Sequence, residues 1–157
     1  MSLKPLSSFQ AQPYRPRTTV VAGLAVVAAL YTGSMFLNWV GVITAGGSYV
    51  IVKGIQQANW ILVVAAILVG LTVRVSRVPP DGIMRFLFVA LDFFVPLGLY
   101  IEYIDNLGRA ESYTTTPYLG PGFFLAVGAT VMLVAATVLG WREREQWSET
   151  AGTERQS

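Results

Sequence analysis

Four long apolar stretches alternate with polar segments along the chain, and each is close to the length of a membrane-crossing helix. We expect these helices at residues 18–37, 56–73, 84–104 and 120–141. A helix that rises about 1.5 Å per residue needs about 20 apolar residues to cross roughly 30 Å of hydrocarbon. The pattern therefore predicts an all-α membrane protein whose transmembrane domain, residues 18–141, is a bundle of four helices.

The basic residues lie on one side of this expected bundle. Nine of the eleven Lys and Arg residues fall before the first stretch, between the second and the start of the third (Arg85 being its second residue), or after the fourth. Cytoplasmic loops carry such an excess of positive charge. We therefore expect a plasma-membrane protein with cytoplasmic tails at residues 1–17 and 142–157. The basic start also fits a signal peptide, but cleavage near Ala45 would leave three spans that contradict the charge pattern, so an uncleaved anchor is preferred.

The two connections on the opposite side are short and prone to β structure. Residues 39–44 and 48–52 favour strands and are separated by Ala45-Gly46-Gly47, which predicts a hairpin. Residues 113–116 are a candidate third strand, and interfacial coil over residues 40–52 is the alternative. We expect a small extracytoplasmic cap, either a β-hairpin or a three-stranded sheet.

Tryptophan positions agree with these boundaries. Trp39, Trp60 and Trp141 fall at expected helix ends, and Trp147 lies just beyond one. Because indole favours the headgroup layer of a bilayer, these side chains are predicted to form an aromatic belt with no binding role.

Composition supports a membrane location and restricts the chemistry. Hydrophobic residues make up 54% of the 157 residues and charged residues 13%, which is more apolar surface than a soluble domain of this size would enclose. The net charge of +2 is explained by membrane orientation and does not indicate nucleic-acid binding. Cysteine and histidine are both absent from the sequence, which removes thiolate nucleophiles and the commonest zinc and haem ligands. We expect no enzyme activity, no cofactor and no metal.

Asp92 is the one charged residue expected deep within a span. It lies about eight residues into the third helix, or roughly 12 Å of rise from the cytoplasmic end. Four residues later, Pro96 removes the backbone N–H that would bond the carbonyl of residue 92. Thr130 and Tyr31 lie at similar expected depth, so these four residues form a candidate intramembrane polar site. A proton- or cation-binding relay is one interpretation. A neutral Asp that locks one helix against its neighbours is favoured, because this acid is solitary.

A second group of charges is expected at the outer end of the third helix and comprises Glu102, Asp105, Arg109 and Glu111. Asp105 and Arg109 are four residues apart, the spacing of an ion pair on a helix surface. An acidic rim that attracts cations or a basic partner is one interpretation. A solvated helix end is favoured, because exposed ion pairs contribute little.

Small residues recur at helical spacing on three of the expected spans. They let helix backbones approach closely, which favours packing in lipid. We expect most of them to pack within the bundle, leaving a remaining stripe, or the aromatic face of the third helix, for a partner protein. The candidate packing residues are Ala25, Ala29 and Gly33 on the first helix, Ala66 and Gly70 on the second, and Gly122, Ala126, Ala136 and Gly140 on the fourth.

Three short motifs carry a resemblance to known proteins. They are Trp39 just after the first span, Gly46-Gly47 in the outer hairpin, and Gly120-Pro121-Gly122-Phe123-Phe124 at the start of the last span. The chain resembles small uncharacterised four-helix membrane proteins common in actinobacteria, and its layout is similar to claudin-type proteins with an outer sheet. The paired loop cysteines of claudins are missing, and the first loop is short. The resemblance implies a style of fold and no activity.

Together these features predict a non-catalytic accessory or assembly subunit of a larger membrane complex. The alternative is a small transporter, or an ion- or proton-conducting oligomer, that uses Asp92. The expected partners are the lipid bilayer and other membrane proteins or further copies of the chain.

Overall fold

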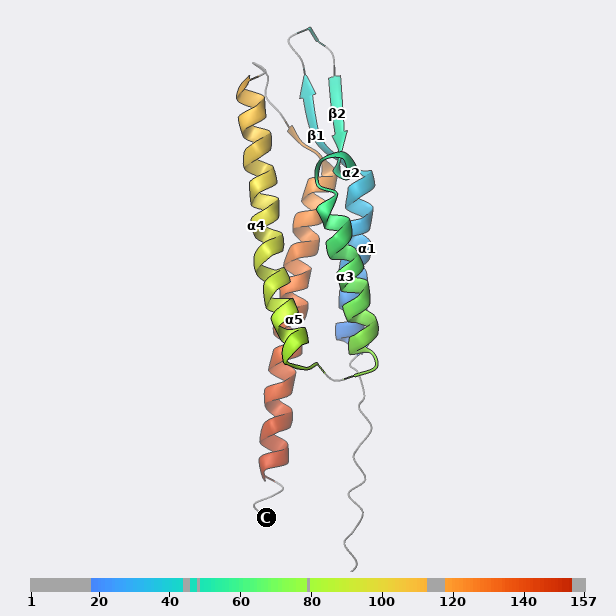
Figure 1. Ribbon diagram of the computed structural model, residues 1–157, viewed down its shortest axis with the longest axis vertical. Coiled ribbons are helices and arrows are strands. Elements are labelled where there is room, and N and C mark those ends of the chain that lie inside the picture. The colour runs from blue at the N-terminus through green and yellow to red at the C-terminus, as the bar shows by residue number, and fades with distance from the viewer. Residues whose placement is uncertain (1–17, 44–45, 48, 79, 113–117, 154–157) are drawn as a thin grey trace, which may run out of the picture.

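The computed structural model describes residues 18–43, 46–47, 49–78, 80–112 and 118–153. The protein is mostly helical, with a small sheet at one end of a long bundle (Figure 1). In chain order the elements are α1 (Thr18–Phe36), β1 (Asn38–Ile43), β2 (Tyr49–Lys53), α2 (Gly54–Gln57), α3 (Trp60–Val75), α4 (Gly82–Ser112), β3 (Tyr118–Leu119) and α5 (Pro121–Thr153).

Within the described residues, three helical segments are long and apolar enough to cross a membrane. They are α1, the Gly82–Asn106 part of α4 and the Pro121–Gly140 part of α5. The second expected span differs, because α3 has only 16 residues, or about 24 Å of rise. It begins at Trp60 and not at residue 56, since a break at Ala58 separates it from the single turn of α2.

Two helices continue beyond their apolar parts. α4 extends to Ser112, and α5 extends to Thr153, so that its last turns project past the other helices (Figure 1). The tail expected from residue 142 is therefore helical as far as Thr153, and the expected boundary marks only the end of the apolar part. Residues 1–17 and the side chains of residues 141–153 lie outside the described part of the chain.

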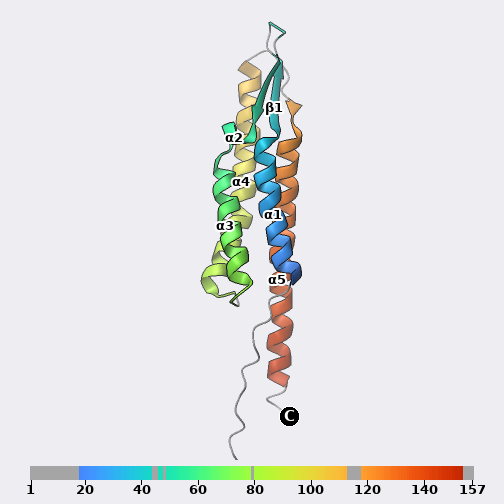
Figure 2. The ribbon, with the colours of Figure 1, turned by 90° about the vertical axis from the view of Figure 1, so that its right-hand side faces the viewer.

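The four long helices are not packed equally. α1 lies between α3 and α5 and contacts both (Figure 2), whereas α4 lies along one side of the bundle and contacts mainly α5 (Figure 1). The side chains of Leu24, Leu68 and Leu133 are fully buried and contribute to the core shared by α1, α3 and α5.

The expected hairpin is confirmed, and it belongs to a three-stranded antiparallel sheet with strand order β2-β1-β3. Gly47 adopts a φ of 76° in the turn, a conformation that favours glycine. The third strand is Tyr118–Leu119, later than the expected strand at residues 113–116, which lie outside the described part of the chain. Tyr118 pairs with Gly41, whose missing side chain leaves room for the tyrosine ring.

Trp39 lies in the interior of the protein, so the expectation that it joins an aromatic belt is wrong. Its side chain is 0% exposed, and the pairing of β1 with β2 shifts register between Asn38 and Val40, where Trp39 lies. The indole Nε1 donates a hydrogen bond to the carbonyl oxygen of Ser34 at 2.8 Å, and the ring meets Phe123 edge to face at 5.7 Å between centroids. The bulge directs the side chain into the junction between helices and sheet.

Two glycines make room for this indole. A Cβ atom at Gly54 or at Gly122 would overlap the Trp39 ring, and at Gly122 it would also lie 2.8 Å from the Ser34 carbonyl oxygen. Gly120, directly before the start of α5 at Pro121, donates its N–H to the Trp39 carbonyl at 2.7 Å.

Candidate functional site

Tyr31 on α1 and Thr130 on α5, which the sequence placed at similar depth, are brought together. Their hydroxyl oxygens are 2.7 Å apart in the buried interior. The Thr130 hydroxyl also donates to the Ala126 carbonyl at 2.9 Å. Because a hydroxyl carries one proton, Tyr31 is the donor to Thr130. The pair is a fully satisfied link between α1 and α5.

Asp92 faces α5 at a different height along the helix axis from the Tyr31–Thr130 pair. It is ten residues from the start of α4, or about 15 Å of rise. Its carboxylate faces the Thr137 hydroxyl at 3.4 Å, and that hydroxyl also donates to the Leu133 carbonyl at 3.1 Å. The single Thr137 proton is shared between two acceptors, and 3.4 Å is long for an O–H···O bond, so the link between Asp92 and α5 is weak.

Thr137 was not anticipated from the sequence. It lies seven residues, or about two helical turns, after Thr130, so both hydroxyls lie on one face of α5. This seven-residue spacing could have identified Thr137 from the sequence as a second hydroxyl on the Thr130 face. The candidate polar site is therefore two separate contacts along one face of α5. Tyr31 of α1 contacts Thr130, and Asp92 of α4 contacts Thr137, about two helical turns away.

Pro96 lies inside α4, which continues as a helix on both sides of it. It lines a groove between α4 and α5 with a volume of about 490 Å³, and Thr130 also contributes to the lining. The main walls are apolar and come from both helices: Leu99 and Tyr100 on α4, and Phe123, Val127 and Val131 on α5. We refer to this feature below as the α4–α5 groove.

The sheet end of α4 is attached to α2 and α3 by polar side chains. Trp60 Nε1 donates to a carboxylate oxygen of Glu102 at 3.2 Å, and the Trp60 ring lies against Gly98. Gln57 donates to the Asn106 side-chain oxygen at 2.5 Å, while Asn106 donates to the Glu102 carbonyl at 2.7 Å. Glu102, expected at a solvated rim, thus takes part in an inter-helix contact.

The other three rim residues lie further along α4. Asp105 is exposed on α4, and the side chains of Arg109 and Glu111 lie outside the described residues. Among the described residues, no group of three or more acidic, histidine or cysteine side chains is placed to hold a metal ion.

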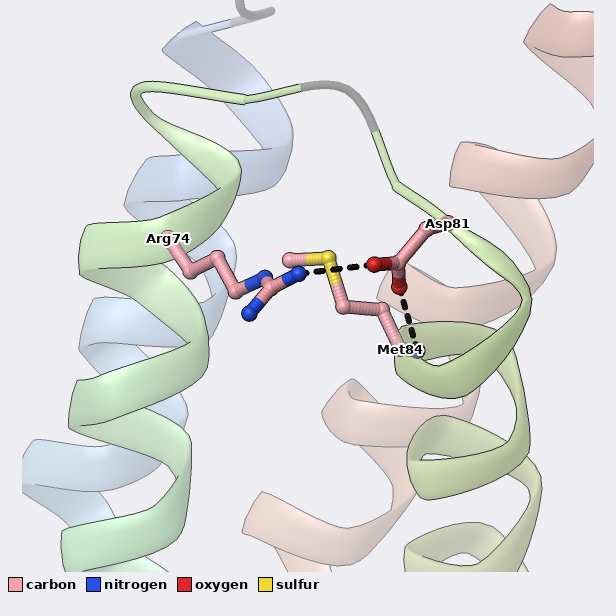
Figure 3. Close-up of polar contacts among 3 residues, drawn as sticks. All are labelled: Arg74, Asp81 and Met84. Atoms are coloured by element: carbon pink, nitrogen blue, oxygen red, sulfur yellow. Dashed lines mark hydrogen bonds and ion pairs between the residues drawn. The ribbon is translucent and has the colours of Figure 1, made fainter.

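At the opposite end, Asp81 joins α3 to the start of α4 (Figure 3). One carboxylate oxygen accepts the backbone N–H of Met84 at 2.9 Å, and the other forms an ion pair with Arg74 at 2.7 Å. The first contact is an N-cap of α4. The Met84 N–H, followed by the Arg74 guanidinium, holds the pKa of Asp81 below its usual range, because both favour the ionised carboxylate.

The small residues divide into two groups, and the expectation that most pack within the bundle fails for five of the nine. Gly122 and Ala126 are buried, and Ala136 and Gly140 are half-buried beside α1. The other five are exposed because they lie on the side of their helix opposite the buried face. These are Ala25, Ala29 and Gly33 on α1, and Ala66 and Gly70 on α3.

Comparison of this chain with protein-family models, curated proteins and solved structures gave no match. The function is therefore argued from the sequence and the geometry described above.

Proposed function

We propose that this protein is a non-catalytic accessory or assembly subunit of a plasma-membrane complex. In this proposal α1, α3, α4 and α5 span the bilayer, both termini are cytoplasmic, and the sheet forms an outer cap. The basic segments support the orientation, because Arg74 and Arg77 lie at the end of the bundle away from the sheet. The short α3 fits a span whose flanking Arg side chains extend to the headgroups.

The observation that carries the proposal is the outward face of α1. Ala25, Ala29 and Gly33 are exposed there, while Leu24 and Tyr31 are buried on the opposite face. At Gly33, a Cβ atom would have no described atom within 4 Å apart from its own helix and chain neighbours. In lipid, such a smooth face lets another helix approach closely, and this close packing drives helix association.

The absence of cysteine from the sequence makes a direct crosslinking test possible. We expect Ala29→Cys to give a crosslinked product of higher mass in native membranes and Val69→Cys to give none. Val69 is a matched control because it is 54% exposed but lies on α3, outside the α1 face that carries Ala25, Ala29 and Gly33. Mass spectrometry of the product identifies either another protein or a second copy.

Ala29→Leu should prevent copurification of that partner by blocking close approach, while Val69→Leu should retain it. A lone, monodisperse protomer in several mild detergents, with no Ala29→Cys product in membranes, would contradict the proposal.

The second candidate is a small transporter or an ion- or proton-conducting oligomer. One observation favours it: Asp92 is half-buried about 15 Å into α4, and its contact with Thr137 is weak, so the carboxyl group is available for another ligand. The test is Asp92→Asn in proteoliposomes. Loss of uptake or conductance with the fold intact supports transport, whereas a lower thermal stability alone assigns Asp92 a structural role.

A further inference from the structure

The α4–α5 groove is a feature that the subunit proposal does not use. We propose that it binds one acyl chain of a phospholipid from the leaflet on the side of the sheet. The inference rests on the proposed membrane location and is independent of any partner on α1.

The surface that lines the groove is almost entirely apolar. Its floor includes Leu99 and Phe123, which are 4% and 7% exposed. Thr130 contributes a hydroxyl, but that group is already bonded to Tyr31 and to the Ala126 carbonyl. A stable buried water needs two to four polar partners, which this lining does not supply. Hydrocarbon is therefore the matching ligand chemistry.

The volume distinguishes an acyl chain from a helix. The groove extends along α5 from Phe123 to Val134, about 16 Å of rise. A helix section of that length and about 10 Å across occupies roughly 1,300 Å³. The groove holds about 490 Å³, so a helix of a partner or of a second copy could insert only some of its side chains. A single flexible chain fits into the groove.

The length and position of the groove fit one leaflet. Its length of about 16 Å is close to half of the roughly 30 Å hydrocarbon core. The end nearest the sheet carries Tyr100 and Tyr103. Tyrosine favours the boundary between headgroups and hydrocarbon, because its ring is apolar and its hydroxyl is polar. A lipid anchored at this end would extend its chain past Val127 and Val131 toward the middle of the bilayer.

The test uses the full chain in liposomes that contain a phospholipid with a photoactivatable acyl chain, followed by mapping of the labelled residues. We expect saturable label on Leu99 and Phe123, which are nearly buried at the base of the groove, and non-saturable label on Phe94, which is 64% exposed outside the groove. Val127→Phe and Val131→Phe add a ring to the groove. Each should lower the floor label about tenfold, equivalent to about 1.4 kcal/mol of overpacking.

Val138→Phe is the matched control, because Val138 is 46% exposed on α5 and does not line the groove. It should leave the floor label unchanged. Val127→Leu supplies a smaller plug if either phenylalanine variant fails to fold, as judged by thermal unfolding. Floor label that is absent, or that persists in the plugged variants, would overturn the acyl-chain site. Absence of label on Phe94 as well would contradict the membrane location itself, whereas loss of the α1 crosslink alone would affect only the subunit proposal.

Discussion

The sheet end of α1 and α5 and the middle of α4 are held in contrasting ways. At the sheet end, backbone and aromatic atoms enclose the indole of Trp39. Its neighbours are Ser34, Gly54, Gly122 and Phe123. The middle of α4 also adds apolar side chains such as Leu91 and Val95 to the core. Its polar contact with α5, in contrast, is the long Asp92–Thr137 pair, and it borders an open groove.

The ends of α4 are nevertheless fixed. Near the sheet, Glu102 and Asn106 bind Trp60 and Gln57, and at the other end Asp81 binds Arg74. In lipid, apolar burial gives little preference for one helix contact over another, so close packing and hydrogen bonds decide which elements are rigid. The comparison indicates a closely packed unit of α1, α3 and α5, and a fourth helix that packs less extensively and has its short polar contacts at its ends.

The strongest test of the comparison is Trp39→Ala. Removing a fully buried indole leaves a cavity and deletes the shorter of two hydrogen bonds to the Ser34 carbonyl, which keeps the Leu37 N–H at 3.3 Å. We expect a loss of about 3–5 kcal/mol in the free energy of unfolding. Reversible unfolding in mixed micelles, followed by circular dichroism, measures this. Phe94→Ala is the control, since Phe94 lies exposed on α4 and its truncation should change stability little. If Trp39→Ala and Phe94→Ala lose equal free energy of unfolding, the sheet end of α1 and α5 is not more tightly held than the middle of α4.

Much of this contrast is not readable from the sequence. Apolar length placed α1, α4 and α5, and β-prone runs around Gly46-Gly47 placed the hairpin, because both signals are local. The burial of Trp39 depends on a bulge and on glycines at positions 54 and 122, which are far apart in the sequence. A tryptophan at a helix end therefore gave the wrong expectation of a lipid-facing belt.

The candidate site was predicted only in part, for a related reason. Counting residues from helix ends brought Tyr31 and Thr130 together correctly, but Asp92 meets Thr137. Nearly every position of α1 is apolar, so its periodicity does not reveal which face is buried, and the exposed stripe of Ala25, Ala29 and Gly33 was expected inside. Which face of such a helix packs is decided by contacts distant in sequence.

A smaller effect on the free energy of unfolding is expected from Tyr31→Phe, at the contact between α1 and α5. The change removes the hydrogen bond to Thr130 but leaves the Thr130 hydroxyl bonded to Ala126, so no buried donor is stranded. We expect a loss of about 0.6 kcal/mol, typical of hydrogen bonds between membrane helices. A double-mutant cycle with Thr130→Val isolates the pair. A coupling energy of zero would show that the hydroxyl contact does not stabilise the α1–α5 interface.

The smallest effect is expected at the exposed end of α4, where Asp81→Ala removes both the N-cap and the ion pair with Arg74. Asp81→Asn is the matched control, because its side-chain oxygen still accepts the Met84 N–H while the charge is lost. We expect the melting temperature to fall in the order wild type, Asp81→Asn, Asp81→Ala.

Because the folded-state pKa of Asp81 is lowered, its charge stabilises the fold above the unfolded value of about 3.9. The wild-type advantage over Asp81→Asn should therefore be present at neutral pH and disappear as the pH falls through the folded-state pKa. It should also shrink in high salt, which screens an exposed pair. An advantage that is unchanged in acid would show that the carboxylate charge does not help hold α4 to α3.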